Sequence, residues 1–250
     1  MKTIAIAAQK GGVGKTASAA AIGAGLHRAG QRVLYIDLDP QANLSAQLGV
    51  DQSAATVTDV LTGKRKITDA IQDTAQGAII PADGLLAGKD ILTGRGAEYR
   101  LRDALEPVKR KHDICLIDCP PSLGLLTIAA LTAADGVIIP CKADRFSLDA
   151  LQEISDTIAA VKERANKRLT VYGVLVTMFM PRSTVQRVML EELTEQASRA
   201  GVTVYEPPIR RAVAVEETQL GGTVYDTRNG AAEDYQQITS TILKQLMKGA

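Results

Sequence analysis

Two lysines flank a run of glycines near the start of the chain, in the sequence QKGGVGKT at 9–16. A short apolar run precedes this sequence, and an alanine-rich run follows it. Glycines between a strand and a helix let consecutive backbone N–H groups converge on phosphate oxygens, and the helix start adds the positive end of its dipole. The pattern predicts a phosphate-binding loop in which Lys15 reaches the β and γ phosphates of a nucleotide and the Thr16 hydroxyl ligates Mg²⁺.

The loop differs from the common phosphate-loop pattern at its first position. GxxxxGK[ST] requires a glycine where this chain has Gln9, and Lys10 comes next. The loop is therefore a variant. Because one lysine suffices to hold a phosphate, Lys10 needs a separate explanation.

Acidic residues follow two further apolar runs. RVLYID ends in Asp37 and is followed by Asp39, and DICLID ends in Asp118. The carboxyl ends of parallel strands meet at one edge of a sheet, where ligands bind. In nucleotide-hydrolysing phosphate-loop proteins, an acidic residue after four apolar ones holds Mg²⁺ directly or through water. We therefore expect these three carboxylates and Thr16 to converge on one metal ion and the γ-phosphate.

The elements that must position these residues follow from an alternation of short apolar runs with longer helical patterns. Strands are expected at 3–7, 32–37, 113–118, 136–140, 171–177 and 202–205. Helices are expected at 16–29, 123–133, 146–164, 182–199 and 231–247. Several strands are apolar on both faces, which indicates parallel strands covered on two sides. The sequence predicts an α/β fold of the P-loop NTPase type, a doubly wound, mostly parallel sheet with helices on both faces.

Length and composition favour a single domain over residues 1–250, with surface insertions within 41–110. The chain has 250 residues and 46% hydrophobic residues, enough for one substantial core. Its three cysteines show neither CxxC spacing nor an even count, which argues against a disulfide scaffold or a zinc site and favours the cytoplasm. No signal peptide, membrane-length apolar run or N-terminal helix-turn-helix extension is expected.

Three segments carry a resemblance to a known family. KGGVGKT, DLDPQANLS and LIDCPPSLGLLTIAALTAADGVIIP resemble the ParA family of partition ATPases, within the deviant Walker A group that includes MinD, and IRRAVAVEETQLGGTVYD extends the resemblance toward the C-terminus. The resemblance implies that Lys10 is the signature lysine, which reaches across a dimer interface to the partner subunit's ATP, while Lys15 serves its own nucleotide.

The resemblance also implies roles for the carboxylates and further nucleotide contacts. Asp39 matches the water-positioning carboxylate, so Lys10, Lys15 and Asp39 are the expected catalytic residues. Asp37 supports the metal shell, and Asp118 is the Walker B residue. The implied contacts to ATP or ADP are Lys10, Gly11, Gly12, Val13, Gly14, Lys15, Thr16, Ala17, Met178, Pro208 and Arg210. Ala17 replaces the family's usual second threonine, so a side-chain contact to the α-phosphate is expected to be absent while the backbone N–H remains.

The implied function is plasmid or chromosome partition by an ATP-dependent sandwich homodimer. The dimer binds double-stranded DNA without sequence preference on the nucleoid, and a ParB-like centromere-binding partner stimulates its slow ATP hydrolysis. The candidate DNA contacts are Arg182, Arg187, Arg210 and Arg211. The net charge of +1 gives them no global support, so ordinary solvated arginines remain an equal interpretation. Val213 stands where some relatives carry another arginine.

Two alternatives stay open. A MinD-like membrane-positioning ATPase would use an amphipathic C-terminal helix, and Ile238, Ile242, Leu243 and Leu246 fall at helical spacing. We interpret this stripe as core packing, so a membrane partner is not expected. An ATPase that positions a protein cargo on the nucleoid is the other alternative, and the sequence does not separate it from DNA partition.

Overall fold

The computed structural model describes residues 1–88 and 92–248. Its centre is a seven-stranded sheet in the order β3-β4-β2-β5-β1-β6-β7. Neighbouring strands are parallel except β3 and β4, which are antiparallel. The strands are β1 (Lys2–Ile6), β2 (Val33–Asp37), β3 (Gln72–Thr74), β4 (Gly77–Ile80), β5 (Ile114–Asp118), β6 (Gly136–Lys142) and β7 (Thr170–Thr177). The predicted mostly parallel α/β sheet is confirmed.

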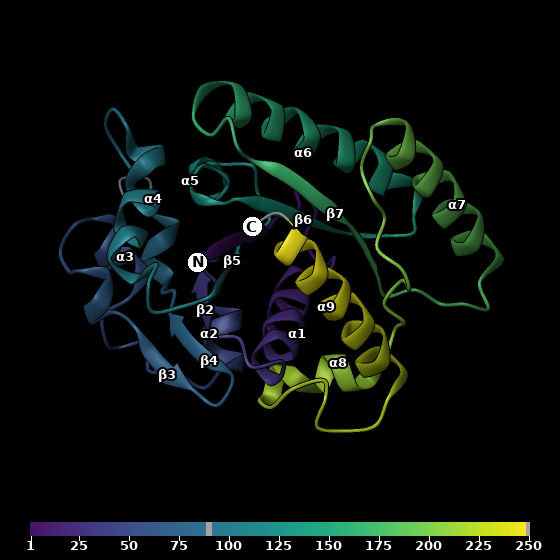
Figure 1. The fold of residues 1–250 in the computed structure, drawn as a ribbon, viewed down its shortest axis with the longest axis horizontal. Helices are drawn as coiled ribbons and strands as arrows, with labels where there is room; N and C mark the ends of the chain where they lie inside the picture. Colours follow the sequence, from purple (N-terminus) through teal and green to yellow (C-terminus); the bar gives the residue numbers. More distant parts are fainter. Residues whose placement is uncertain (89–91, 249–250) are drawn as a thin grey trace.

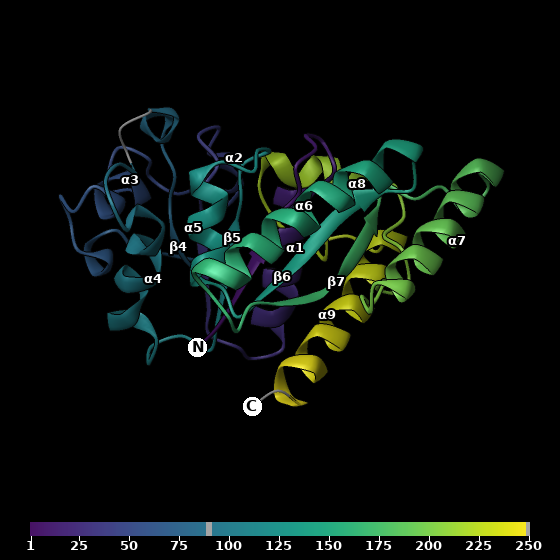
Figure 2. The same cartoon turned by 90° about the horizontal axis from the view of Figure 1, so that it is seen from above.

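Helices cover both faces of this sheet. The α-helices are α1 (Lys15–Arg28), α2 (Asn43–Gln47), α3 (Val57–Leu61), α4 (Arg100–Leu105), α5 (Leu125–Ala133), α6 (Arg145–Arg164), α7 (Thr184–Arg199), α8 (Val213–Glu217) and α9 (Gly230–Lys248). Figure 1 shows α5 and α6 above the sheet and α1 and α9 below it. In Figure 2, α3 and α4 lie at one end of the molecule and α7 at the other, beyond β7.

Side-chain alternation along the central strands divides the core into two buried clusters. Ile117 belongs to the cluster on the α5 face, and Tyr35 and Leu116 belong to the cluster that includes α1 and α9. Because successive strand residues point to opposite faces, Asp37 and Asp118 follow Tyr35 and Leu116 onto the α1 face. These two carboxylates are paired residues of β2 and β5. The strands thus deliver both to the carboxyl edge on one face.

Helix α1 lies close to the sheet because its inner face is made of small residues. A Cβ on Gly23 would lie 2.3 Å from the Tyr35 hydroxyl oxygen, so only glycine allows this approach. On the other side, the Ser18 and Tyr235 hydroxyl oxygens are 3.2 Å apart, which joins α1 to α9. The helix that begins at the phosphate loop is therefore held from two sides.

Two parts of the sheet differ from the sequence prediction. Residues 77–80 fall within the segment expected to carry surface insertions, yet they form β4, in which Ile79 and Ile80 are fully buried. Residues 202–205 form no strand, and Val204 makes only an isolated bridge to Val174 on β7. Pro207 and Pro208 come after Glu206, and they lack the N–H groups that would continue a ladder beyond it.

The apolar stripe of α9 packs into the core. Ile238 and Ile242 are fully buried, Leu246 is nearly so, and Leu243 packs against the same cluster from its edge. This confirms the interpretation of the stripe as core packing. Among residues 1–88 and 92–248, no helix combines the length and apolarity needed to cross a membrane.

Candidate nucleotide and metal site

The glycine loop connects β1 to α1 through two left-handed residues. Gly12 has φ 66° and Gly14 has φ 76°, a region that side chains with a Cβ rarely adopt. The Thr177 hydroxyl at the end of β7 lies 2.9 Å from the Val13 carbonyl oxygen and 3.1 Å from the Cys141 carbonyl oxygen. The loop is thus anchored to β6 and β7, and the start of α1 faces the carboxyl edge of the sheet.

Lys15 lies inside this loop and is nearly buried. Its Nζ donates to the Lys10 carbonyl oxygen at 3.3 Å, and 6% of the residue is exposed. Burial lowers the pKa of Lys15, while the charges of Asp118 and Asp39 oppose that shift. The ammonium group thus lies within the loop and within electrostatic reach of these carboxylates.

Asp118 is the residue that best fits a cation. It is fully buried, and neither carboxylate oxygen accepts a hydrogen bond from the part of the chain that the structure describes. Burial, followed by the charge of Asp37, raises the pKa of Asp118 well above its usual range, while Thr16 and Lys15 act against that rise. An unpartnered buried carboxylate is costly. A Mg²⁺ ion or its water ligands would supply the missing partners.

Asp37 and Asp39 are satisfied by the chain itself to a greater extent. Asp37 Oδ2 accepts from the Ser45 N–H at 2.9 Å and from the Ser45 hydroxyl at 2.7 Å, and Oδ1 accepts from the Asp39 N–H at 3.0 Å. Burial raises the pKa of Asp37 to about 6 although these bonds oppose it. Asp39 Oδ1 accepts from the Gln41 N–H at 3.0 Å.

The expected convergence of three carboxylates on one ion is therefore only partly present. Within the described ranges, no three His, Cys, Asp or Glu side chains are placed to hold a metal by themselves. This suits Mg²⁺, which usually takes one or two carboxylates and completes its shell with water and substrate phosphates. Asp118 and Thr16 fit the role of holding it, with Asp37 beside them.

Lys10 lies outside the loop interior. Its Nζ is 3.0 Å and 3.2 Å from the two carboxylate oxygens of Asp144 and 5.2 Å from the centroid of the Phe146 ring. Asp144 also caps α6 by accepting from the Ser147 N–H at 2.9 Å. Although burial acts to raise it, the hydrogen bonds and charge of Lys10 lower the pKa of Asp144, together with Ser147. The two lysines thus occupy different environments.

Met178, Pro208 and Arg210 come together on two adjacent segments at the end of β7. The Phe179 N–H donates to the Ile209 carbonyl oxygen at 2.9 Å, which holds residues 176–179 beside residues 209–211. Met178 has a left-handed φ of 53°.

Next to the phosphate loop, in the first turn of α1, Ala17 borders a small crevice with Gln47 and Gln76. Ala17 offers no polar side-chain group to this crevice.

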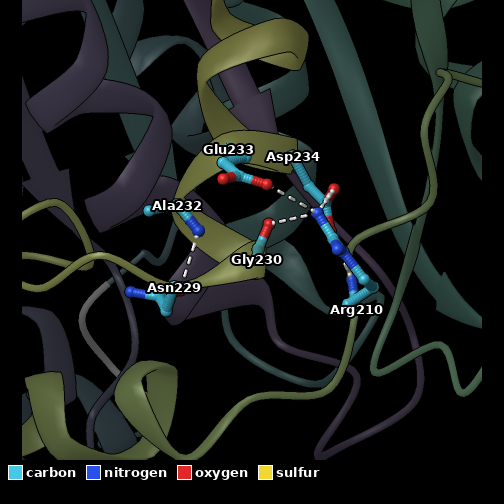
Figure 3. Close-up of polar contacts among 6 residues, drawn as sticks. All are labelled: Arg210, Asn229, Gly230, Ala232, Glu233 and Asp234. Atoms are coloured by element: carbon cyan, nitrogen blue, oxygen red, sulfur yellow. Dashed lines mark hydrogen bonds and ion pairs between the residues drawn. The ribbon is translucent and has the colours of Figure 1, made fainter.

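Arg210 is bound within the chain, in contrast to the expected free DNA contact. Its Nε and Nη2 donate to the two Asp234 oxygens at 2.8 Å each, and Nη2 also donates to the Gly230 carbonyl oxygen at 2.8 Å (Figure 3). Glu233 adds a contact at 3.3 Å, and the Asn229 side chain accepts from the Ala232 N–H at the start of α9. Arg210 thus fastens the segment after β7 to α9.

The other expected DNA contacts are more accessible. Arg182 and Arg187 are exposed near the start of α7, and Arg187 makes a 3.4 Å hydrogen bond to Thr184. Arg211 is exposed and lies 3.7 Å from Glu216. Sequence reasoning missed Asp144, Ser45 and Thr177. Two of them carried a local signal: Asp144 stands at the start of a predicted helix, and Ser45 ends the sequence Asn43-Leu44-Ser45 that follows DLDPQA.

A family model and several known proteins match this chain. A family model described as "AAA domain" matches residues 1–171. The chromosome partitioning protein ParA of Caulobacter vibrioides is 38% identical, with 98% of this chain and 95% of that protein aligned. The sporulation initiation inhibitor protein Soj of Bacillus subtilis is also 38% identical, over 96% of this chain and 98% of Soj.

Solved structures share the whole fold. A Mycobacterium smegmatis protein described as cobyrinic acid a,c-diamide synthase, with bound ADP and magnesium, has a TM-score of 0.87 and 34% identity, covering 100% of this chain and 97% of its own. Apo McdA of Cyanothece has a TM-score of 0.87 and 26% identity, covering 97% and 99%.

Proposed function

The chain belongs to the ParA family of partition ATPases, and from that premise we propose that it uses Mg²⁺ and ATP to form a homodimer that binds double-stranded DNA and releases it after hydrolysis. The task is plasmid or chromosome partition, and the location is the nucleoid in the cytoplasm. The contrast between the two loop lysines carries the proposal. Lys15 faces its own carboxylates, whereas Lys10 lies outside the loop on Asp144.

Each residue of the site has a distinct role in hydrolysis. Asp118 and Thr16 hold the metal ion, which neutralises charge on the phosphates when bound, and Asp37 supports them. Lys15 binds the β and γ phosphates. Asp39, whose carboxylate is oriented by the Gln41 N–H, positions the attacking water. A desolvated cation beside the γ-phosphate stabilises the charge that develops in the transition state, as an arginine finger does.

Lys10 supplies that cation to the partner's nucleotide. Exposed apolar side chains stand just after β7 and at the starts of α5, α6, α7 and α8. They are Leu125, Phe146, Met178, Val185 and Val213, with exposed fractions of 38%, 70%, 37%, 71% and 67%. Leu125 and Phe146 follow β5 and β6, the two neighbours of β1 in the sheet, so they flank the loop that β1 leads into and are suited to an association surface. A second copy that covers them brings its Lys10 to this loop.

The DNA contacts are Arg182, Arg187 and Arg211, and a ParB-like partner stimulates hydrolysis. Arginines that neutralise phosphates give binding without sequence preference that weakens with salt. Because one chain carries a net charge of only +1, the dimer must combine two local surfaces to bind DNA.

The deciding experiment is fluorescence anisotropy of a random-sequence DNA duplex, titrated with protein in Mg-ATP and in Mg-ADP at two salt concentrations. We expect binding in Mg-ATP alone, weakened by salt. Lys10→Ala is the matched control, because it keeps Lys15 and the carboxylates and should lose ATP-dependent binding. Equal binding in ATP and ADP would contradict the switch, and no binding in either would overturn the DNA assignment in favour of a protein partner.

A further inference from the structure

We propose that Ser45 is a positioning residue for the metal side of the nucleotide site, acting through Asp37. The inference rests on the proposed function only in requiring that the chain binds Mg²⁺ with a nucleotide. It does not depend on DNA, on dimerisation or on a stimulating partner.

Ser45 holds one oxygen of Asp37 with two donors. Both its N–H, at 2.9 Å, and its hydroxyl, at 2.7 Å, point to Oδ2, and Ser45 is fully buried. Hydrogen bonds to an ionised acceptor are short and about twice as strong as neutral ones. The Asp39 N–H holds Oδ1, so three donors fix the plane of the Asp37 carboxylate.

A neighbouring backbone group determines the direction of the Ser45 hydroxyl proton. The Ala82 N–H donates to Ser45 Oγ at 2.9 Å. A hydroxyl that accepts from one side offers its own proton to another group, and Asp37 Oδ2 is that group. Ala82 lies just beyond β4, next to β2 in the sheet, so two neighbouring strand ends hold the hydroxyl between them.

This arrangement matters because Asp37 is the strand neighbour of Asp118. Asp118 has no hydrogen-bond partner of good geometry in the described parts of the chain, with only the Thr16 hydroxyl close by, so the protein holds its carboxylate less firmly than that of Asp37. Asp37 is the member of the pair whose carboxylate is already held in one orientation by three donors. If its carboxylate can rotate, it no longer offers a fixed oxygen to the waters around the ion. Residues that orient metal-binding groups typically change metal affinity by about 10–100-fold when they are mutated.

The alternative is a purely structural role, in which Ser45 only ties α2 to the end of β4. That role predicts lower stability and an equal loss of nucleotide and metal binding. A positioning role predicts a loss confined to the metal. The two are separated by measuring metal binding and metal-free nucleotide binding on the same variant.

The experiment counts free Mn²⁺ by electron paramagnetic resonance in the presence of ADP and measures ADP binding in EDTA by equilibrium dialysis. For Ser45→Ala we expect Mn²⁺ affinity to fall about tenfold, at the low end for such residues, and ADP affinity in EDTA to stay unchanged. Ser45→Thr keeps the hydroxyl and should restore Mn²⁺ binding. Ser45→Cys keeps a side chain of similar size with a weak donor, so it tests the same point if the alanine variant unfolds.

Ser53→Ala is the matched control. The Ser53 N–H and hydroxyl donate to Asp51 Oδ1 at 2.8 Å and 2.7 Å, the same double contact at an exposed position. It should bind Mn²⁺ as the parent does. Parental Mn²⁺ affinity in folded Ser45→Ala, or an equal loss of ADP binding in EDTA, overturns the inference. A parent that binds Mn²⁺ with ADP but never DNA defeats the proposed function and leaves the role of Ser45 intact, whereas a parent that binds no Mn²⁺ with ADP defeats both.

Discussion

At the scale of single residues, Lys10 and Lys15 show how five positions along a loop separate two functions. The left-handed turns at Gly12 and Gly14 direct Lys15 inward to Asp118 and leave Lys10 at the surface, where Asp144 binds it. While Lys10 is bound to Asp144 it is not available to another subunit. If Lys10 reaches the partner's nucleotide as proposed, the Lys10–Asp144 ion pair must break, and it therefore competes with that dimer.

The first prediction concerns this ion pair. Asp144→Asn keeps an oxygen that caps α6 but removes the charge that holds Lys10. A half-exposed pair contributes about 0.2–1 kcal/mol, so the ATP-dependent dimer should tighten by up to about fivefold. Light scattering over a concentration series in Mg-ATP measures this. Lys10→Ala should instead remain a monomer that binds ATP, and a weaker Asp144→Asn dimer would contradict the competition.

The second prediction concerns the step of hydrolysis. Asp39→Ala should bind ATP and dimerise as the parent does, yet release phosphate about 10²–10⁴ times more slowly, the range for lost acid–base or water-orienting groups. Phosphate release at saturating Mg-ATP measures turnover, and light scattering shows the dimer. Asp51→Ala, at an exposed site, is the control. Unchanged turnover in Asp39→Ala would remove this residue from its role.

The residue types of the site could be predicted, but their partners could not. Spacing alone indicated Lys15, Thr16 and Asp118, because each stands at a fixed place relative to a strand end. Asp144 lies 134 positions from Lys10, and Ser45 meets Asp37 only because α2 folds back over the strand end. Such pairs depend on tertiary contacts that no local pattern records.

At the scale of elements, the segment after β7 is held by Arg210. Asp234, with 5% of its side chain exposed, receives two donors from Arg210, and the same guanidinium binds the Gly230 carbonyl oxygen. A Cβ on Gly230 would lie 2.6 Å from Arg210 Cζ, so glycine at this position lets the guanidinium close over the start of α9. Arg210 thus fixes residues 209–211 beside the end of β7.

The third prediction separates this contact from DNA binding. Arg210→Ala leaves a buried carboxylate unpaired and should lower the free energy of unfolding by about 1–3 kcal/mol, less than for a fully buried pair because the arginine is partly exposed. Arg211→Ala should change it by less than about 0.5 kcal/mol. Urea unfolding compares the two. Equal stability of both variants would contradict the assignment of Arg210 as a fastening residue.

Among the elements, length decided what the sequence could predict. The five strands of five or more residues in the structure follow long apolar runs and were expected at nearly their observed positions. β4 has four residues and β3 three, and Gln and Asp in β3 give no apolar alternation. β4 pairs with β2 and β3 pairs with β4, and this extension of the sheet is a tertiary effect. By contrast, residues 202–205 were expected to form a strand but make only an isolated bridge, and the prolines after Glu206 cannot extend it.

At the scale of the whole molecule, the connections from β1, β2, β5, β6 and β7 to the helices that follow them leave one edge of the sheet, and the glycine loop is one of them. Everything proposed for catalysis and dimerisation lies on that edge, because parallel strands all end there. The net charge of +1 indicates none of this, because it sums 29 basic and 28 acidic residues whatever their place on the surface. The sequence therefore predicted the fold class, whereas it could not separate DNA-contacting arginines from ordinary solvated ones.

The position of Phe146 is suited to a fluorescent probe. The chain has no tryptophan, so its intrinsic emission comes from six tyrosines. The Phe146 ring is 70% exposed and lies under the Lys10 ammonium. An indole introduced there by Phe146→Trp would be the only tryptophan, which emits at longer wavelength than the tyrosines, beside the ammonium group that leaves it in the proposed dimer. The rate of dimer formation could then be followed in stopped flow by the wavelength and intensity of tryptophan emission, without an added dye.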